Sequence, residues 1–238
     1  MPIKDEFSRT AYVYGEASID ALKKAKVAVF GIGGVGGHLC EALARAGIGQ
    51  IDIFDRDTVS LSNINRQIIA LHSNVGKSKV EAMKERILDI NPDCNVNAFN
   101  VFYLPENADE YDLSAYDYIA DAVDTVSAKI ELVIRANASK TPIISAMGAG
   151  NKTDPSRFQV ADIYDTTVCP LARIMRKELK NRGIKKLKVV YSTEEPKKST
   201  VTDSESGKPI PGSLPFVPAV MGLIMAGEII NSIVKPKL

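Results

Sequence analysis

A glycine-rich segment, Gly31-Ile-Gly-Gly-Val-Gly36, contains the residue types that bind phosphate. Backbone N–H groups can approach an anion closely where side chains are absent, and the start of a helix adds a favourable dipole. Gly31 would permit the tight turn, Gly33 and Gly34 the close approach to phosphate, and Gly36 the packing of helix on sheet. Asp55 follows the next apolar run, where a carboxylate can accept hydrogen bonds from ribose hydroxyls. These residues predict a nucleotide site, and alone they favour a nicotinamide cofactor such as NAD.

Polar side chains downstream of Asp55 favour ATP. Arg66 can fork across phosphate oxygens, Lys79 supplies a mobile positive charge, and Asn63 and Gln67 can donate hydrogen bonds without adding charge. A dehydrogenase has no physical need for such residues beside its ribose. A nucleotidyl-transfer site must hold three phosphates and stabilise the charge that develops on the α-phosphorus.

Apolar runs and helical periodicity place these residues on an α/β frame. Strands are predicted over 27–30, 51–54, 118–120 and 142–145, and they alternate with helical segments that include 77–90 and 127–139. This alternation predicts a doubly wound, mainly parallel Rossmann-like sheet. Beyond residue 150 we expect strands over 158–163 and 188–191, a basic helix over 171–182, a mobile crossover loop over 194–214 and a buried helix over 216–234.

The motifs Ser62-Asn-Ile-Asn-Arg-Gln67 and Val75-Gly-x-x-Lys79 resemble those of the ubiquitin-activating-enzyme superfamily of ATP-dependent adenylating proteins. The resemblance spans roughly 7–149. It implies that Asp55 binds ribose and that Asn63, Arg66, Gln67 and Lys79 hold the triphosphate. It also implies that Asp124 binds Mg²⁺, and that Arg9 enters the neighbouring subunit's site in a homodimer. Asp121 is expected to be structural.

Two further segments, 169–183 and 212–218, look like those of the tRNA threonylcarbamoyladenosine dehydratases. The chain also lacks the two Cys-x-x-Cys pairs that close a zinc site in many sulfur-carrier adenylyltransferases, and three cysteines cannot supply four ligands. The resemblance implies one adenylating domain over 1–238, with an ATP-binding part at 7–149 and a substrate and crossover extension at 150–238. It implies ATP-dependent cyclisation of a threonylcarbamoyl group on tRNA through an acyl-adenylate.

A cluster of basic residues in the second half suits a tRNA partner. The positive side chains attract the phosphate backbone without reading bases, although a solvated helix face is the alternative. The residues we expect to bind tRNA are Arg173, Arg176, Lys177 and Lys180. Cys169 invites comparison with a thioester cysteine, but ring closure needs no covalent enzyme intermediate, so we interpret it as a packed thiol.

Composition and charge limit the class of protein and the compartment that the sequence fits. The net charge is +1, the N-terminal residues do not form a signal peptide, and the three cysteines do not make a disulfide framework. We therefore expect a cytoplasmic protein with no membrane span. The alternatives left open are a sulfur-carrier-protein adenylyltransferase, an NAD-dependent oxidoreductase and a non-catalytic nucleotide-binding adaptor. The sequence also leaves open a sulfur-relay protein partner.

Overall fold

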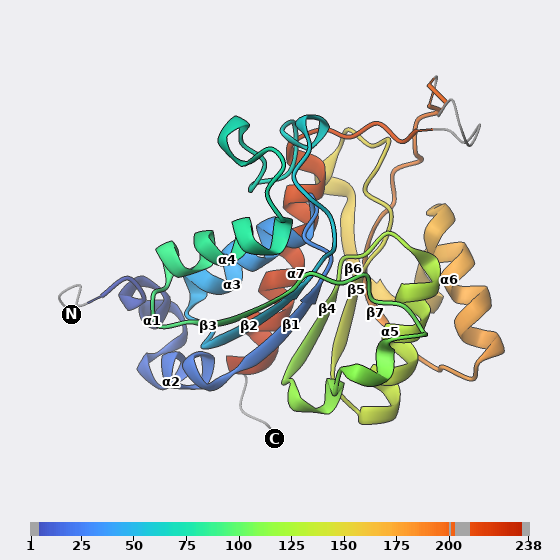
Figure 1. Cartoon of the computed structure of the whole chain (residues 1–238). Coiled ribbons are helices and arrows are strands. Elements are labelled where there is room, and N and C mark those ends of the chain that lie inside the picture. Colours follow the sequence, from blue (N-terminus) through green and yellow to red (C-terminus); the bar gives the residue numbers. More distant parts are fainter. Residues whose placement is uncertain (1–4, 200, 203–209, 235–238) are drawn as a thin grey trace.

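A computed structural model describes residues 5–199, 201–202 and 210–234. Within these residues, seven strands form one sheet in the order β3-β2-β1-β4-β5-β7-β6 (Figure 1). The strands are β1 (Lys26–Phe30), β2 (Gln50–Phe54), β3 (Asn95–Phe99), β4 (Tyr118–Asp121), β5 (Ile143–Ala146), β6 (Phe158–Asp162) and β7 (Lys188–Ser192). Every neighbouring pair is parallel except β6 and β7, which are antiparallel. The predicted doubly wound, mainly parallel sheet is confirmed.

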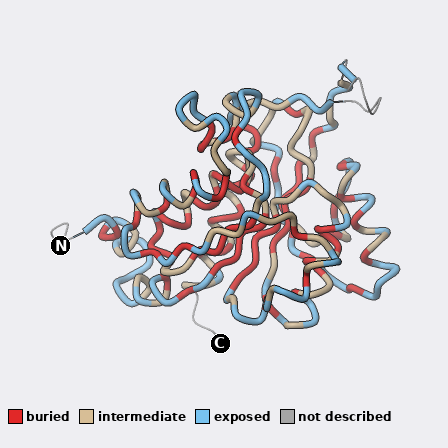
Figure 2. The backbone as a smooth tube through the Cα atoms, in the orientation of Figure 1, coloured by how far each residue is buried: buried red, intermediate tan, exposed pale blue. Residues whose placement is uncertain are grey.

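Helices cover both faces of this sheet, as a buried parallel sheet requires. One face carries α3 (Gly36–Ala46), α4 (Lys79–Ile90) and α7 (Phe216–Val234), and the other carries α5 (Val126–Ser139) and α6 (Pro170–Asn181). Two further helices, α1 (Ser8–Tyr14) and α2 (Glu16–Lys24), precede β1. Figure 2 shows that burial is concentrated in the strands and on the inward sides of the helices.

α7 packs as a core helix. By length and composition it is the one helix of the described residues that could cross a membrane. In the fold it crosses α3 so closely that a Cβ built on Gly222 would lie 2.3 Å from the carbonyl oxygen of Val35. Met221, Met225 and Ile229 are fully buried in the same core as α3 and β1. This is the buried helix that the sequence predicts.

Two parts of the fold differ from the sequence-based expectation, and part of one predicted segment lies outside the described residues. β3 was not predicted, because Asn95, Asn97 and a single neighbouring strand give it the weak pattern of an edge. Glu194 does not belong to a loose crossover loop, since its buried carboxylate accepts hydrogen bonds from Thr153 and Asp154. The middle of that predicted loop, residues 200 and 203–209, lies outside the described residues.

Candidate nucleotide site

The carboxyl ends of β1, β2 and β4 border a cavity of about 380 Å³. The chain runs outward from β1 to β2 and β3, then returns to the other side of β1 as β4. This is the point where strand order reverses, and open α/β sheets bind their ligands at such a point. The cavity therefore lies where the architecture alone predicts a site.

The glycine loop joins β1 to α3 as expected. Gly31 has a φ of +90°, and a Cβ there would lie 2.7 Å from the carbonyl oxygen of Ala122. Gly33 and Gly34 line the cavity, and a Cβ on Gly33 would have nothing nearer than 3.9 Å. Gly36 does not line the cavity, because its Cα faces the loop itself, where a Cβ would lie 1.8 Å from the oxygen of Gly31. Gly36 therefore supports the site by allowing α3 to pack against the glycine loop, and it does not contact the cavity itself.

Asp55 lies at the end of β2 and connects this loop to a buried lysine. Its carboxylate accepts the N–H of Ile32 at 2.7 Å and the N–H of Asp57 at 2.8 Å. The Nζ of Lys79 lies 3.9 Å from Asp55 Oδ1 and 2.7 Å from Asp57 Oδ2. Burial raises the pKa of the Asp55 carboxyl above its ordinary value, and the charge of Lys79 opposes that shift.

Three other predicted triphosphate ligands, Asn63, Arg66 and Gln67, also line the cavity, and Arg66 and Gln67 lie beside the glycine loop. Arg66 is half-buried and donates to the carbonyl of Ser62 at 3.0 Å and to the side chain of Asn65 at 2.9 Å. Asn63 accepts the N–H of Ser60, which fixes its side chain at the end of a short 3₁₀ turn, η1 (Leu61–Asn63).

Two buried polar atoms at the cavity have no hydrogen-bond partner among the described residues. They are the Oε1 of Gln67 and the hydroxyl of Tyr103, and both side chains line the cavity. Buried polar groups are normally satisfied, so such atoms point to a polar ligand or bridging water. This observation fits a nucleotide, which offers phosphate-bound water and ribose or base hydrogen-bonding groups.

Asp124 and Asp121 have the different environments that the sequence predicts for them. The Asp124 carboxylate is exposed and lines the cavity. Asp121 is fully buried, pairs with Lys129 at 3.0 Å and accepts the hydroxyl of Ser145 at 2.6 Å. Lys129 also donates to the carbonyl of Val123 at 3.0 Å, so this buried network holds the turn that carries Asp124.

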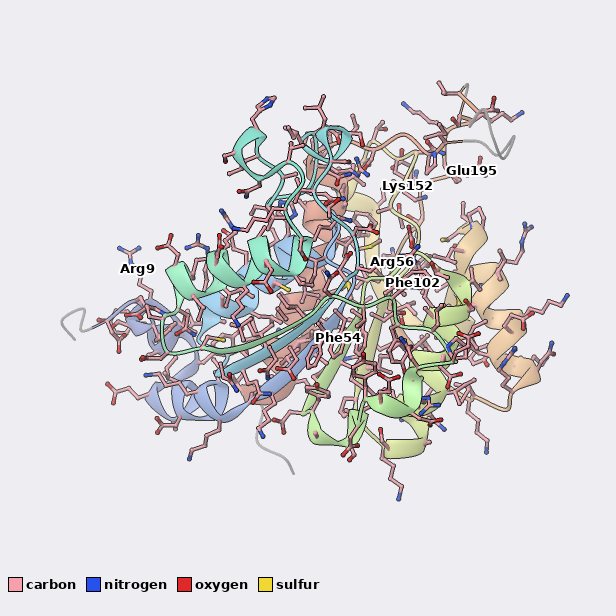
Figure 3. The ribbon with its side chains drawn as sticks, viewed as in Figure 1. Arg9, Phe54, Arg56, Phe102, Lys152 and Glu195 are labelled. Carbon is pink, nitrogen blue, oxygen red and sulfur yellow. The ribbon has the colours of Figure 1, made fainter. Side chains whose placement is uncertain are left out.

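The far end of the cavity contains residues that sequence reasoning missed. The guanidinium of Arg56 lies 4.1 Å from the ring centroid of Phe102, and both side chains line the cavity (Figure 3). Phe102 follows β3, so recognising that strand would have placed it at the carboxyl edge with the other site residues. Gly150 and a second set, Pro211, Gly212 and Ser213, also line the cavity. The glycine and proline content of these two segments predicts loops, but it does not predict that the loops reach the nucleotide cavity.

Other predicted residues lie away from this cavity. Arg9 is exposed on α1, at the left edge of the molecule in Figure 3, where Arg56 and Phe102 lie near the middle, and it does not line the cavity of its own chain. Cys169 is buried in the core at the start of α6, which agrees with a packed thiol.

The four residues expected to bind tRNA lie on α6. Arg173, Lys177 and Lys180 are exposed. The guanidinium of Arg176 is instead half-buried against the carbonyl and hydroxyl of Thr166. Arg176 therefore has a structural partner that the sequence did not reveal.

Similarity to known proteins extends over nearly the whole chain. The ThiF family model matches residues 7–238. The chain is 43% identical to the tRNA threonylcarbamoyladenosine dehydratase of Bacillus subtilis, over 97% of this chain and 95% of that protein. A crystal structure of the Escherichia coli tRNA N6-threonylcarbamoyladenosine dehydratase in complex with ATP superposes with a TM-score of 0.88 at 36% identity, covering 98% of this chain and 97% of that one.

The sulfur-carrier branch is matched over a shorter part. The molybdopterin-synthase adenylyltransferase of Salmonella typhimurium is 36% identical over 53% of this chain and 50% of that protein. Similarity to the dehydratases thus continues through the second half of the chain, in which α6 and α7 lie. The chain belongs to the ThiF family and, within it, to the tRNA threonylcarbamoyladenosine dehydratases.

Proposed function

We propose that this chain catalyses the ATP-dependent dehydration and cyclisation of the threonylcarbamoyl group of tRNA threonylcarbamoyladenosine. One observation carries the proposal: the glycine loop, Asp55, Arg66, Gln67 and Lys79 surround a single cavity. The family to which the chain belongs, and the ATP complex of a similar protein, support ATP as the nucleotide.

The chemistry explains why a nucleotide is needed. A carboxylate is a poor electrophile at neutral pH, and bound ATP supplies the adenylyl group that converts it to an acyl-adenylate. A carbamoyl nitrogen of the same modified nucleoside then attacks the acyl carbon, the bond to AMP breaks, and the nitrogen loses its proton. Because nucleophile and electrophile are tethered, proximity lowers the barrier to ring closure.

Each wall of the cavity has a separate part in this reaction. Asp55 accepts hydrogen bonds from the ribose hydroxyls, and the Arg56–Phe102 pair offers a flat surface to the base. Arg66 and Lys79 leave their present partners and stabilise negative charge on the phosphates as pyrophosphate departs. Gln67 supplies a buried amide whose oxygen has no hydrogen-bond partner within the described residues.

Mg²⁺ belongs with this proposal. The described residues contain no group of three His, Cys, Asp or Glu side chains that could hold a metal alone. Mg²⁺ is commonly bound through one or two carboxylates together with substrate phosphates, and the exposed carboxylate of Asp124 at the cavity suits that mode.

A homodimer, a sulfur-relay protein partner and a cytoplasmic location remain predictions. The dimer is motivated by Arg9, which lies exposed on α1 away from its own cavity. All three cysteines are free and buried, which suits a reducing compartment but offers a sulfur-relay partner no exposed thiol.

The proposed reaction is tested by mass spectrometry of nucleosides from tRNA carrying threonylcarbamoyladenosine. After incubation with protein, ATP and Mg²⁺, we expect the modified nucleoside to lose the mass of one water.

Lys79→Ala should slow product formation on the order of 10²-fold, because a cation at the phosphates is lost. Lys77→Ala is the matched control, since Lys77 pairs with Glu85 outside the cavity. Adenylation of a Gly-Gly carrier peptide with no change in the tRNA would favour the sulfur-carrier alternative, and hydride transfer to NAD would favour the oxidoreductase.

The pH dependence of ATP binding should report on Asp55. Its carboxylate binds in the ionised form, and burial raises its pKa. Affinity should therefore be full above that raised pKa and be lost as pH falls through it, at a higher pH than for an ordinary aspartate. Asp55→Asn should weaken ATP binding about tenfold to 10²-fold. It should also remove most of the loss of ATP affinity at low pH, as measured by calorimetry. Asp89→Asn, at an exposed aspartate, is the control. An equal loss of ATP affinity at low pH in both variants would contradict the assignment of Asp55 as the ribose ligand.

Binding of tRNA should depend on the exposed basic side chains of α6. Replacing Arg173 and Lys177 with alanine should weaken tRNA binding and reduce the slope of log affinity against log salt by about 1.5. Lys24→Ala with Lys26→Ala removes the same charge at the start of β1, away from α6, and should leave that slope unchanged. Equal slopes for the two double variants would exclude α6 from the tRNA surface.

Sharing of active sites across a dimer should be visible in mixed subunits. Arg9→Ala and Lys79→Ala subunits should each have little activity alone. Hybrid dimers would contain one complete site, so an equal mixture after subunit exchange should recover roughly a quarter of wild-type activity. Mass spectrometry can verify that hybrids form, and hybrids without activity would show that Arg9 does not act across the interface.

A further inference from the structure

Residues Pro211, Gly212 and Ser213 form a strap at the rim of the nucleotide cavity. They line it together with Gly33 and Gly34 of the glycine loop, although about 180 residues separate the two segments in the sequence. Two loops face the strap from opposite sides, one following β5 and one containing η1. In Figure 1 this part of the chain passes over the carboxyl edge of the sheet, before α7 begins.

Asn151 holds the strap from the β5 side. Its N–H donates to the carbonyl of Gly212 at 2.8 Å, and its Oδ1 accepts the N–H of Gly212 at 2.6 Å. Its carbonyl accepts the N–H of Lys197 at 2.8 Å, so one residue fastens both arms of the crossover segment. Asn151 has a φ of +60°, a left-handed conformation that asparagine tolerates better than most residues. The preceding Gly150 packs so tightly that a Cβ there would lie 3.1 Å from Pro211.

Asn65 holds the strap from the opposite side. Its Nδ2 donates to the carbonyl of Ser213 at 3.0 Å, and its Oδ1 accepts from the guanidinium of Arg66 at 2.9 Å. The strap is thus bonded to the residue next to a proposed phosphate ligand. The two asparagines use opposite halves of their amides, because Asn151 accepts from the strap and Asn65 donates to it.

We propose that Asn65 and Asn151 are positioning residues that hold the strap closed over the acyl-adenylate. The inference rests on the proposed function. Water attack on the acyl carbon would release AMP and regenerate the threonine carboxylate, which consumes ATP without product. Closure excludes water while the tethered nitrogen attacks the same carbon. Because Pro211 and Gly212 are exposed and held mainly by these few hydrogen bonds, the strap can open to admit the modified nucleoside.

The test is the ratio of AMP released to cyclised nucleoside formed, measured at saturating ATP with the full-length protein. Wild-type protein should give a ratio near one. Asn151→Gly keeps the left-handed backbone and its two backbone hydrogen bonds but removes Oδ1, and it should raise the ratio about threefold to tenfold. Asn65→Ala should raise it similarly. Exposed Asn137→Ala, at the far end of α5, is the control and should match wild type.

The aspartate variants separate this role from a general structural one. Asn151→Asp retains an acceptor for the N–H of Gly212, so its ratio should stay near that of wild type. Asn65→Asp loses the donor to Ser213 and should behave like Asn65→Ala. A merely structural role would predict no such difference between the two sites. Deuterium exchange at the Gly212 amide should be faster in Asn151→Gly than in wild type, independently of catalysis.

Three outcomes would overturn the inference. They are an unchanged ratio in Asn151→Gly and Asn65→Ala, unchanged exchange at Gly212, and equal effects of the two aspartate variants. Failure of the proposed function looks different, because wild-type protein would then form no cyclised nucleoside at all.

Discussion

The site depends on the absence of side chains at Gly31 and Gly36. Any Cβ on Gly36 would lie 1.8 Å from the oxygen of Gly31, and one on Gly31 would lie 2.7 Å from the oxygen of Ala122. These approaches let α3 begin directly against the ends of β1 and β4. Asp55 is then fixed by the N–H of Ile32 in the same loop. A larger residue at Gly36 would displace the helix start and, with it, the wall against which a phosphate is held.

Charges around the cavity fall into fixed and exchangeable pairs. The Asp121–Lys129 pair is fully buried and carries extra hydrogen bonds from Ser145 and to Val123, so separating it would leave an uncompensated buried charge. Lys79 pairs instead with Asp57, whose side chain is 60% exposed and is readily solvated when the pair opens. Arg66 donates to exposed partners. The cations that face the cavity can therefore move to a ligand at little cost, while the turn that carries Asp124 stays in place.

Local sequence patterns predicted most of the sheet and the two walls built from contiguous motifs. The glycine loop, Asp55 and the residues from Asn63 to Lys79 follow strands with strong apolar patterns, so their convergence could be deduced. Phe102 could not, because it follows the weakly patterned edge strand β3. The strap could not be placed either, since its position depends on hydrogen bonds from Asn65 and Asn151, which no periodicity encodes. The partnership of Arg176 with Thr166 is likewise a tertiary contact.

The second half of the chain places the start of its basic helix at the same edge of the sheet as the cavity. Cys169 caps the start of α6. Its sulfur would lie 3.6 Å from a Cβ built on Gly148, and Gly150 of the same loop lines the cavity. Arg173, Lys177 and Lys180 then follow along the exposed side of α6, away from that edge. An RNA backbone bound along α6 would reach the cavity from the α5 and α6 face, past the loop that contains Asn151. The strap is bonded to that loop through Asn151, so this path would lead to the contact that we propose holds the strap closed.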